Sequence, residues 1–135
     1  MTPYRLKLRV YYEDTDAAGI VYHARYLAFA ERARTEALRE AGVPHDKLVT
    51  QFGLIFVVRR VEMDYLRPVR LDAEVVVETG PWALGAATVD VRQRFEVGGE
   101  VTGRIRVGLA CVRLADGRPA RIPGRWRDAL RESRV

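Results

Sequence analysis

The sequence predicts an α+β domain in which an antiparallel sheet wraps around one long central helix. Three observations lead to this fold class: a single run of strong helix formers at 23–41, four later segments with the patterns of β-strands, and short turns between them. Strands joined by short turns pair antiparallel, and a helix with one apolar stripe must bury it against the sheet. The 135 residues, 48% of them hydrophobic, fit one domain over 1–135.

The first strand is expected at 5–12, where Leu6, Leu8 and Val10 alternate with charged residues. A polar loop that contains glycine follows at 13–21. This loop connects the first strand to the long helix.

The segment 23–41 is rich in Ala, Leu, Glu and Arg, which favour helices. Its small side chains recur at helical spacing and form a stripe: Ala30, Ala33, Ala37 and Ala41. Such a stripe lets the helix lie close to a sheet. Gly42 is placed to cap the C-terminus of the helix, and Pro44 prevents it from continuing.

The rest of the chain is predicted to be mostly strand, with a short helix at 123–130. The strands are expected at 55–65, 73–80, 88–97 and 101–114. Gly98-Gly99 forms a hairpin turn between two of them. With the first strand, these segments predict a sheet of five to six strands.

Composition limits the possible functions. The net charge of +5 comes from arginine, since only Lys7 and Lys47 are lysines, and it favours an anionic partner such as nucleic acid or a phosphate-bearing small molecule. It is equally compatible with genome composition or a hot habitat. One cysteine, Cys111, excludes an internal disulfide and fits a core position. No signal peptide or transmembrane run is expected, so the predicted location is cytoplasmic.

The candidate chemistry lies directly before the long helix, where three carboxylates fall within four residues: Glu13, Asp14 and Asp16. A helix N-terminus presents free N–H groups and a partial positive charge, which can bind an oxyanion that forms on a carbonyl. A carboxylate beside it could attack that carbonyl or activate water. The alternatives are helix capping, which is common for such residues, and a metal loop, which the spacing does not support.

The two histidines are assigned differently. His23, at the helix start, is either a surface or capping residue or a group that orients substrate and moves protons. His45 follows Pro44 and is predicted to lie at the surface in a turn. No Gly-x-Ser-x-Gly motif, phosphate loop or dinucleotide fingerprint is present.

Residues 10–36, with the pattern Asp-x-Asp-x-x-Gly-Ile-Val-Tyr, closely resemble the signature of hotdog-fold acyl-CoA thioesterases. Residues 56–72 resemble the same group, the 4-hydroxybenzoyl-CoA thioesterase family, and within it the Tol–Pal-associated, YbgC-like branch. The resemblance implies hydrolysis of short- to medium-chain acyl-CoA, with aromatic acyl groups left open. It implies no cofactor and no metal, since coenzyme A is part of the substrate.

The resemblance also assigns roles to single residues. The second aspartate of the motif, Asp16, is the implied catalytic carboxylate, as nucleophile or general base. His23 and Tyr12 are implied supporting catalytic residues, and the backbone N–H groups of Tyr22 and His23 are implied to polarise the thioester carbonyl. Further implied substrate contacts are Gly19, Val21, Val58, Arg59 and Arg60, and the candidates for the coenzyme A phosphates are Arg59, Arg60, Arg67 and Arg70.

In assembly, the resemblance implies a homodimer with sheets paired edge to edge, a further homotetramer, and a peripheral association with an envelope complex. Two other functions remain open at this stage. One is a hotdog dehydratase or hydratase that acts on 3-hydroxyacyl thioesters, because fold alone does not fix function. The other is a non-catalytic module that binds acyl-CoA or nucleic acid, although no basic stripe interleaved with aromatic residues supports nucleic-acid recognition.

Overall fold

The computed structural model describes residues 3–132, so residues 1–2 and 133–135 of the predicted domain lie outside the described part. The first half holds β1 (Tyr4–Arg9), the short 3-10 helix η1 (Tyr12–Asp14), α1 (Arg25–Glu40) and α2 (His45–Phe52). The second half holds β2 (Leu54–Tyr65), β3 (Glu74–Leu84), β4 (Thr88–Val97), β5 (Glu100–Arg113) and α3 (Gly124–Glu132).

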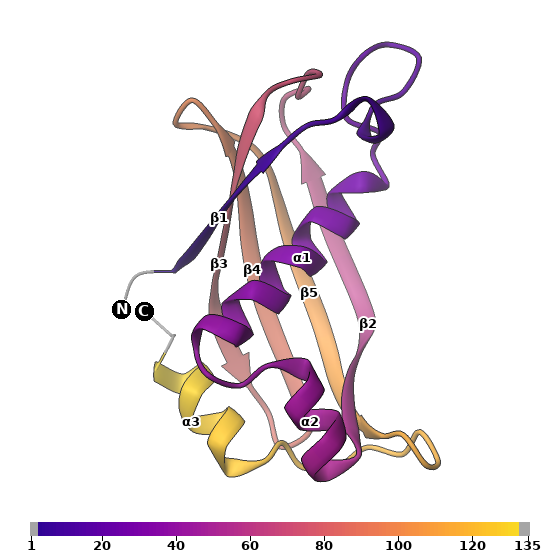
Figure 1. The fold of residues 1–135 in the computed structure, drawn as a ribbon, viewed down its shortest axis with the longest axis vertical. Coiled ribbons are helices and arrows are strands. Elements are labelled where there is room, and N and C mark those ends of the chain that lie inside the picture. The colour runs from indigo at the N-terminus through magenta and orange to yellow at the C-terminus, as the bar shows by residue number, and fades with distance from the viewer. Residues whose placement is uncertain (1–2, 133–135) are drawn as a thin grey trace.

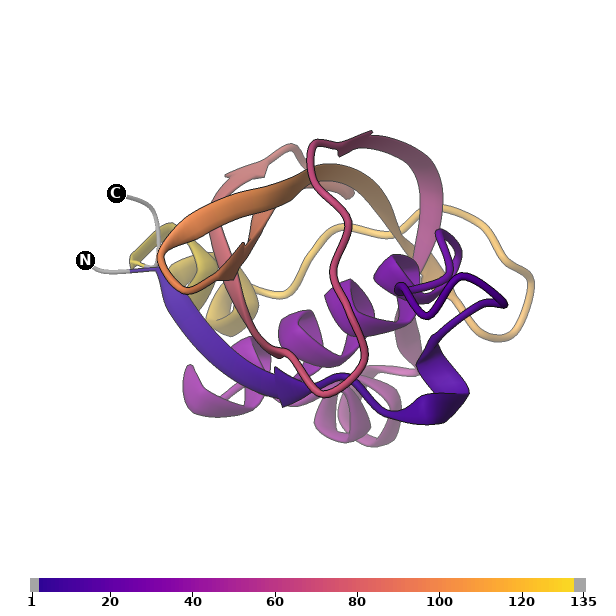
Figure 2. The same cartoon turned by 90° about the horizontal axis from the view of Figure 1, so that it is seen from above.

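The five strands form one antiparallel sheet in the order β1-β3-β4-β5-β2. The sheet curves around α1, which lies along its concave face (Figures 1 and 2). The predicted α+β architecture is therefore confirmed. No helix within residues 3–132 is long and apolar enough to cross a membrane.

The predicted alanine stripe holds α1 on the sheet. Ala30 and Ala33 have no exposed surface and Ala37 is also buried, so along this stripe only small side chains lie between the helix backbone and the strands. Phe29 packs beside them in the same core as Phe95 of β4. Each large apolar side chain buried in this way stabilises the fold by roughly 1.5–3 kcal/mol.

The boundaries of the N-terminal elements differ from the predicted ones. β1 ends at Arg9 instead of residue 12, because the chain turns into η1 after Val10, whose N–H donates to the carbonyl of Ala73. α1 begins at Arg25, so His23 lies in the turn before the helix and not in its first turn.

The structure corrects the predicted surface turn at His45. His45 is the first residue of α2 and is half-buried, with its ring at a steep angle to that of Phe56. The helix follows Pro44 and ends at Phe52, and Gly53 caps it with a left-handed φ of 65°. Leu48 is its one buried residue, which is too weak a pattern to predict a helix from sequence.

β2 is the long edge strand of the sheet. It pairs with β5 on one side, and no strand in the described part of the chain pairs with its other side. Val58 is 51% exposed, and Val61 and Tyr65 are also exposed. The register shifts at Arg59, which forms a bulge. Exposed apolar side chains thus lie on an unpaired strand edge, a combination that natural sheets usually cover or blunt.

Candidate active site

The loop before α1 has a buried base built around Asp14. Its side chain is 3% exposed. Oδ1 accepts hydrogen bonds from Nε and Nη2 of Arg25 at 2.9 and 2.7 Å, and Oδ2 accepts one from the N–H of Tyr11 at 2.8 Å. The carboxylate of Asp14 therefore ties η1 to the first turn of α1.

The loop continues into an exposed tip at residues 16–19. Thr15 and Val21 form an antiparallel bridge that closes it, and the N–H of Asp16 donates to the carbonyl of Ile20 at 2.9 Å. Gly19 has a φ of 75°, and its N–H donates to the carbonyl of Asp16 at 3.0 Å. This left-handed position explains the glycine of the motif, because other residues reach it only with strain.

Asp16 is exposed at this tip and faces a cavity. Its Oδ1 accepts a hydrogen bond from the N–H of Ala18 at 2.8 Å, and no described residue donates to its Oδ2. We call the adjacent space, of about 340 Å³, the loop cavity; its lining is Asp16, Ile20, Val21, His23, Tyr26, Tyr65, Leu66, Arg67 and Pro68. The structure thus brings four predicted residues together at one cavity: Asp16, Val21, His23 and Arg67.

The start of α1 offers donors, but not all of those implied by the resemblance. The N–H of Tyr22 donates to the carbonyl of Asp14 at 2.9 Å, so it is already engaged. No described residue accepts from the N–H of His23 or Ala24, and no side chain caps the helix. The carboxylates of the loop therefore do not cap α1. The free donors at its positive end begin at His23.

Tyr65, at the end of β2, is a site residue that the sequence analysis did not identify. Its hydroxyl donates to the carbonyl of His23 at 3.0 Å, and its ring contacts that of Tyr26 edge to face, with centroids 5.3 Å apart. It lines the same loop cavity as Asp16 although it lies 49 residues further along the chain, where spacing gives no signal. Tyr65 fixes the peptide that joins His23 to Ala24.

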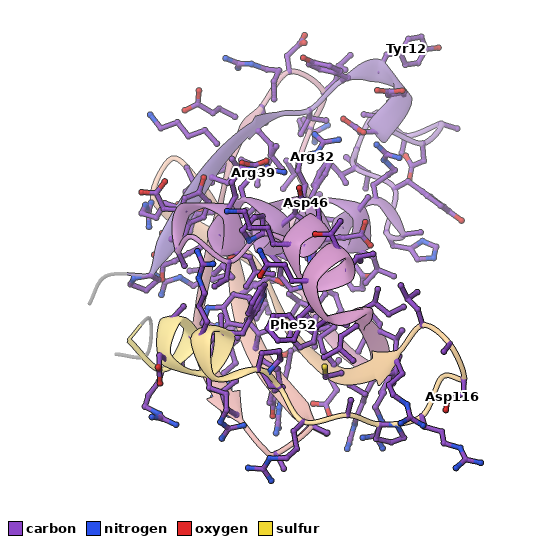
Figure 3. The ribbon with its side chains drawn as sticks, turned by 60° about the horizontal axis from the view of Figure 1, so that its bottom comes forward. Tyr12, Arg32, Arg39, Asp46, Phe52 and Asp116 are labelled. Carbon is purple, nitrogen blue, oxygen red and sulfur yellow. The ribbon has the colours of Figure 1, made fainter. Side chains whose placement is uncertain are left out.

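Tyr12 does not line the loop cavity. Its side chain is 84% exposed and projects from the tip of the molecule at η1 (Figure 3). Its carbonyl accepts hydrogen bonds from the N–H and the hydroxyl of Thr15, at 3.1 and 2.8 Å. Within one chain the backbone of Tyr12 supports the loop, and the phenol of Tyr12 is exposed and lies outside the loop cavity.

The predicted contacts on β2 also lie away from the loop cavity. Val58 lines a second space between α1 and β2, of about 290 Å³, which we call the helix cavity; its lining is Glu31, Arg34, Thr35, Leu38, His45, Ile55, Phe56, Val58, Trp82 and Leu109. Arg59 and Arg60 line a hollow on the outer face of the sheet, where Arg60 pairs with Glu62 at 3.0 Å.

The remaining arginine candidates are also placed. Arg67 lies at the loop cavity and pairs with Glu100 at 3.2 Å. Arg70 is exposed and lies beside the loop, where its backbone forms a bridge with Ile20.

Cys111 is buried, as predicted, and burial raises the pKa of its thiol, which suits packing and not nucleophilic attack. Residues 3–132 contain no group of three or more His, Cys, Asp or Glu side chains that could hold a metal ion.

Comparison with known proteins decides the family. Residues 18–103, more than half of the chain, match the family model described as the thioesterase superfamily. The chain belongs to the thioesterase superfamily. It is 42% identical over 116 residues to the acyl-CoA thioesterase YbgC of Haemophilus influenzae, a match that covers 86% of this chain and 85% of that protein.

Solved structures of thioesterases share the fold. A probable thioesterase from Bartonella henselae superposes with a TM-score of 0.83 at 35% identity, covering 88% of this chain and 98% of the other. A thioesterase complexed with coenzyme A and Zn from Thermus thermophilus superposes with a TM-score of 0.82 at 31% identity, covering 98% of this chain and 94% of the other. The predicted hotdog fold and family are confirmed, and this thioesterase is a thioester hydrolase.

Proposed function

We propose that this thioesterase hydrolyses acyl-coenzyme A, with Asp16 as the carboxylate that acts on the thioester carbonyl. The observation that carries the proposal is that Asp16 and His23, whose N–H is free of partners among the described residues, line the same cavity at the start of α1. Relatives named as acyl-CoA thioesterases, and the related Thermus thermophilus structure with coenzyme A, support the choice of substrate.

The chemistry needs an oxyanion site and a carboxylate on one carbonyl. The carbonyl oxygen accepts from the N–H groups of His23 and Ala24, which replace the implied pair of Tyr22 and His23. Oxyanion donors of this kind typically contribute about 10²–10³ in rate. Asp16 then attacks the carbonyl carbon or deprotonates a water that attacks it, and the sulfur leaves with the electrons of the C–S bond. An acyl-Asp16 anhydride, if formed, is hydrolysed by water.

The side chain of His23 is suited to deliver a proton to the leaving sulfur, since it lies on the wall of the cavity that holds Asp16. Gly19 supports the site by allowing the left-handed turn beside Asp16. Arg67 lines the cavity and Arg70 bridges Ile20 beside it, which supports the proposal that they meet the phosphate groups of coenzyme A. The catalytic role of Tyr12 stays a prediction.

We also propose that a second copy of the chain covers β2. The unpaired edge and its exposed apolar side chains favour pairing with an identical strand. Antiparallel pairing of two copies about the middle of β2 puts Tyr65 of one copy opposite Leu54 of the other, so the loop cavity of each meets the helix cavity of its partner. Val58, Arg59 and Arg60 would then act on the substrate of the partner. The tetramer, the envelope association and the cytoplasmic location stay predictions.

The test is release of free thiol from a series of acyl-CoA thioesters from acetyl to palmitoyl, with benzoyl-CoA included. We expect Asp16→Asn to lower kcat about a thousandfold, within the range typical of a lost acid–base or nucleophilic group. Glu13→Gln, which removes another exposed carboxylate of the same loop, is the matched control and should keep the wild-type rate.

Equal rates for wild type and Asp16→Asn would contradict the proposal. Crotonyl-CoA, followed by its ultraviolet absorbance, tests the alternative of hydration. Hydration without thiol release would replace hydrolysis as the function.

A further inference from the structure

The helix cavity has an apolar wall and one buried cation. Six residues from α1, β2, β3 and β5 form the apolar part: Leu38, Ile55, Phe56, Val58, Trp82 and Leu109. The cation is Arg34, which is only 7% exposed. Arginine stays protonated even in such surroundings, so a full positive charge sits at the wall of an otherwise apolar space.

The charge of Arg34 is not neutralised by the described part of the protein. No described carboxylate lies within ion-pair distance of it, and its one hydrogen bond runs from Nη1 to Oε1 of Gln93 at 3.0 Å. Its Nε and Nη2 make no hydrogen bond to described residues and are not fully buried, and Arg34 lines the helix cavity. A buried charge without a counter-charge is unfavourable. The Arg34 guanidinium therefore has free donors that a negatively charged ligand could use.

Gln93 orients the guanidinium without removing its charge. Its amide nitrogen donates to the carbonyl of Ala30 and to the hydroxyl of Thr79, both at 2.9 Å. Both protons of the amide are thereby used, which leaves Oε1 turned to Arg34. Residue 93 therefore presents a neutral amide oxygen to Arg34. A carboxylate at this position would have formed an internal ion pair instead.

The other polar groups of the helix cavity do not supply that negative charge close by. Glu31, on the exposed rim, favours the charged form of Arg34 through its electrostatic field, but it makes no ion pair with the guanidinium. Burial, and then the Arg34 guanidinium, lower the pKa of His45, so its imidazole is neutral at pH 7. Among the described residues, the inner part of the cavity therefore offers one unshared cation.

The helix cavity lies too far from Asp16 of its own chain to share one small substrate. Arg34 follows Tyr26, at the loop cavity, by eight residues of α1, about 12 Å of rise. In the β2-paired dimer that we propose, however, the helix cavity would adjoin the loop cavity of the partner. The acyl group bound at the partner's Asp16 would extend toward this guanidinium.

We infer that the helix cavity receives the distal end of an acyl group that carries a carboxylate, so that the thioesterase prefers monothioesters of dicarboxylic acids. The inference rests on the proposed function. The methylene chain would pack on the apolar wall, and the terminal carboxylate would take the free Nε and Nη2 donors of Arg34 as a two-pronged pair. The thioester itself is hydrolysed as before, with no additional reactant.

The test compares thioesters of equal length with and without the terminal carboxylate: adipyl-CoA with hexanoyl-CoA, and the corresponding four-, five- and eight-carbon pairs. We expect wild type to favour the carboxylated member at the length that spans the site. In Arg34→Met the ratio of the two kcat/KM values should fall about 10- to 100-fold, as expected for losing a charged hydrogen-bonded pair. Arg34→Lys should retain part of the preference, because it keeps the charge. Arg32→Met, at an exposed position of the same helix, should keep all of it.

A binding measurement separates this inference from the proposed function. Trp82 lines the helix cavity, and the only other tryptophan of the sequence, Trp126, does not. Titration with free adipate and its homologues, against hexanoate, should change tryptophan fluorescence in wild type and in Arg34→Lys but not in Arg34→Met.

Thiol release from all thioesters with a ratio that Arg34→Met leaves unchanged would overturn the inference and leave the proposed function standing. Dicarboxylate binding without any thiol release would overturn the proposed function and leave the carboxylate site at Arg34 standing. Absence of any fluorescence change with every dicarboxylate in wild type would also overturn the inference.

Discussion

The base and the tip of the loop before α1 each hold an aspartate, and the two side chains have opposite surroundings. At the base, Asp14 is buried and both its oxygens accept hydrogen bonds, from Arg25 and from the backbone of Tyr11. At the tip, Asp16 is exposed to a cavity and one of its oxygens makes no bond to the described residues. The base therefore holds the loop in place, and the tip keeps the free carboxylate oxygen that the proposed function requires.

Under the proposed function, this contrast assigns a structural role to Asp14 and a chemical role to Asp16 within one short segment. A carboxylate that is fully hydrogen-bonded and paired with arginine is stabilised where it is and is a poor nucleophile or base. A carboxylate held by a single N–H keeps its position and an unshared oxygen. Only two positions separate the aspartates, but the bridge between Thr15 and Val21 lies between them. Asp14 precedes this bridge and Asp16 follows it.

The largest expected effect that tests the contrast is on stability. Asp14→Asn should lower the free energy of unfolding by about 3 kcal/mol, because it leaves the Arg25 guanidinium without its counter-charge. Asp16→Asn should lower it by no more than about 1 kcal/mol, the usual value of one exposed hydrogen bond. Urea unfolding followed by tryptophan fluorescence measures both. A loss from Asp16→Asn as large as that from Asp14→Asn would remove the distinction between base and tip.

A smaller effect is expected at the glycine of the tip. An alanine at position 19 meets no atom within 4 Å, so Gly19→Ala introduces backbone strain alone, worth about 1–2 kcal/mol at this φ. Because the strain falls on the turn that presents Asp16, we expect kcat to decrease as well. Gly42→Ala, with a φ of 80° at the far end of α1 and equally open space, is the matched control.

Gly42→Ala should cost similar stability in thermal unfolding and leave kcat unchanged. An equal decrease of kcat in both variants would show that the tip has no special part in catalysis.

The smallest expected effect concerns Tyr65, whose hydroxyl joins the turn before α1 to the sheet through the carbonyl of His23. Tyr65→Phe removes the hydroxyl that fixes the His23 carbonyl and with it the orientation of the Ala24 N–H. Because one neutral hydrogen bond is lost, we expect kcat to decrease roughly threefold to tenfold. The free energy of unfolding should fall by about 1 kcal/mol. Steady-state kinetics with a good acyl-CoA substrate measures it, and Tyr4→Phe, on β1, serves as control. An unchanged kcat would limit Tyr65 to packing on Tyr26.

The sequence was sufficient to predict the main elements of the fold, because their patterns are long. The alanine stripe of α1 and the alternation at 88–97 each bury one continuous face, and both appear in the structure at nearly the expected residues. α2 was not predicted, because eight residues with one buried leucine carry too little periodicity. Short elements of this kind are fixed by contacts with distant residues, such as that between His45 and Phe56.

For the site, the residues alone indicated a carboxylate at a helix start but could not choose among Glu13, Asp14 and Asp16. The resemblance made that choice, and the observed exposure of the two aspartate side chains is consistent with it. Neither route identified Tyr65 or the unpaired charge of Arg34. Both depend on which strand lies beside α1, and that neighbour is set by the packing of the whole sheet.

The uncovered side of β2 has a further consequence for how such a protein works in solution. If the substrate site is completed only when two edges meet, the rate per molecule depends on how many chains have found a partner. Activity would then fall on dilution even though every chain remains folded, and the amount of protein present would itself act as a control on thioester turnover.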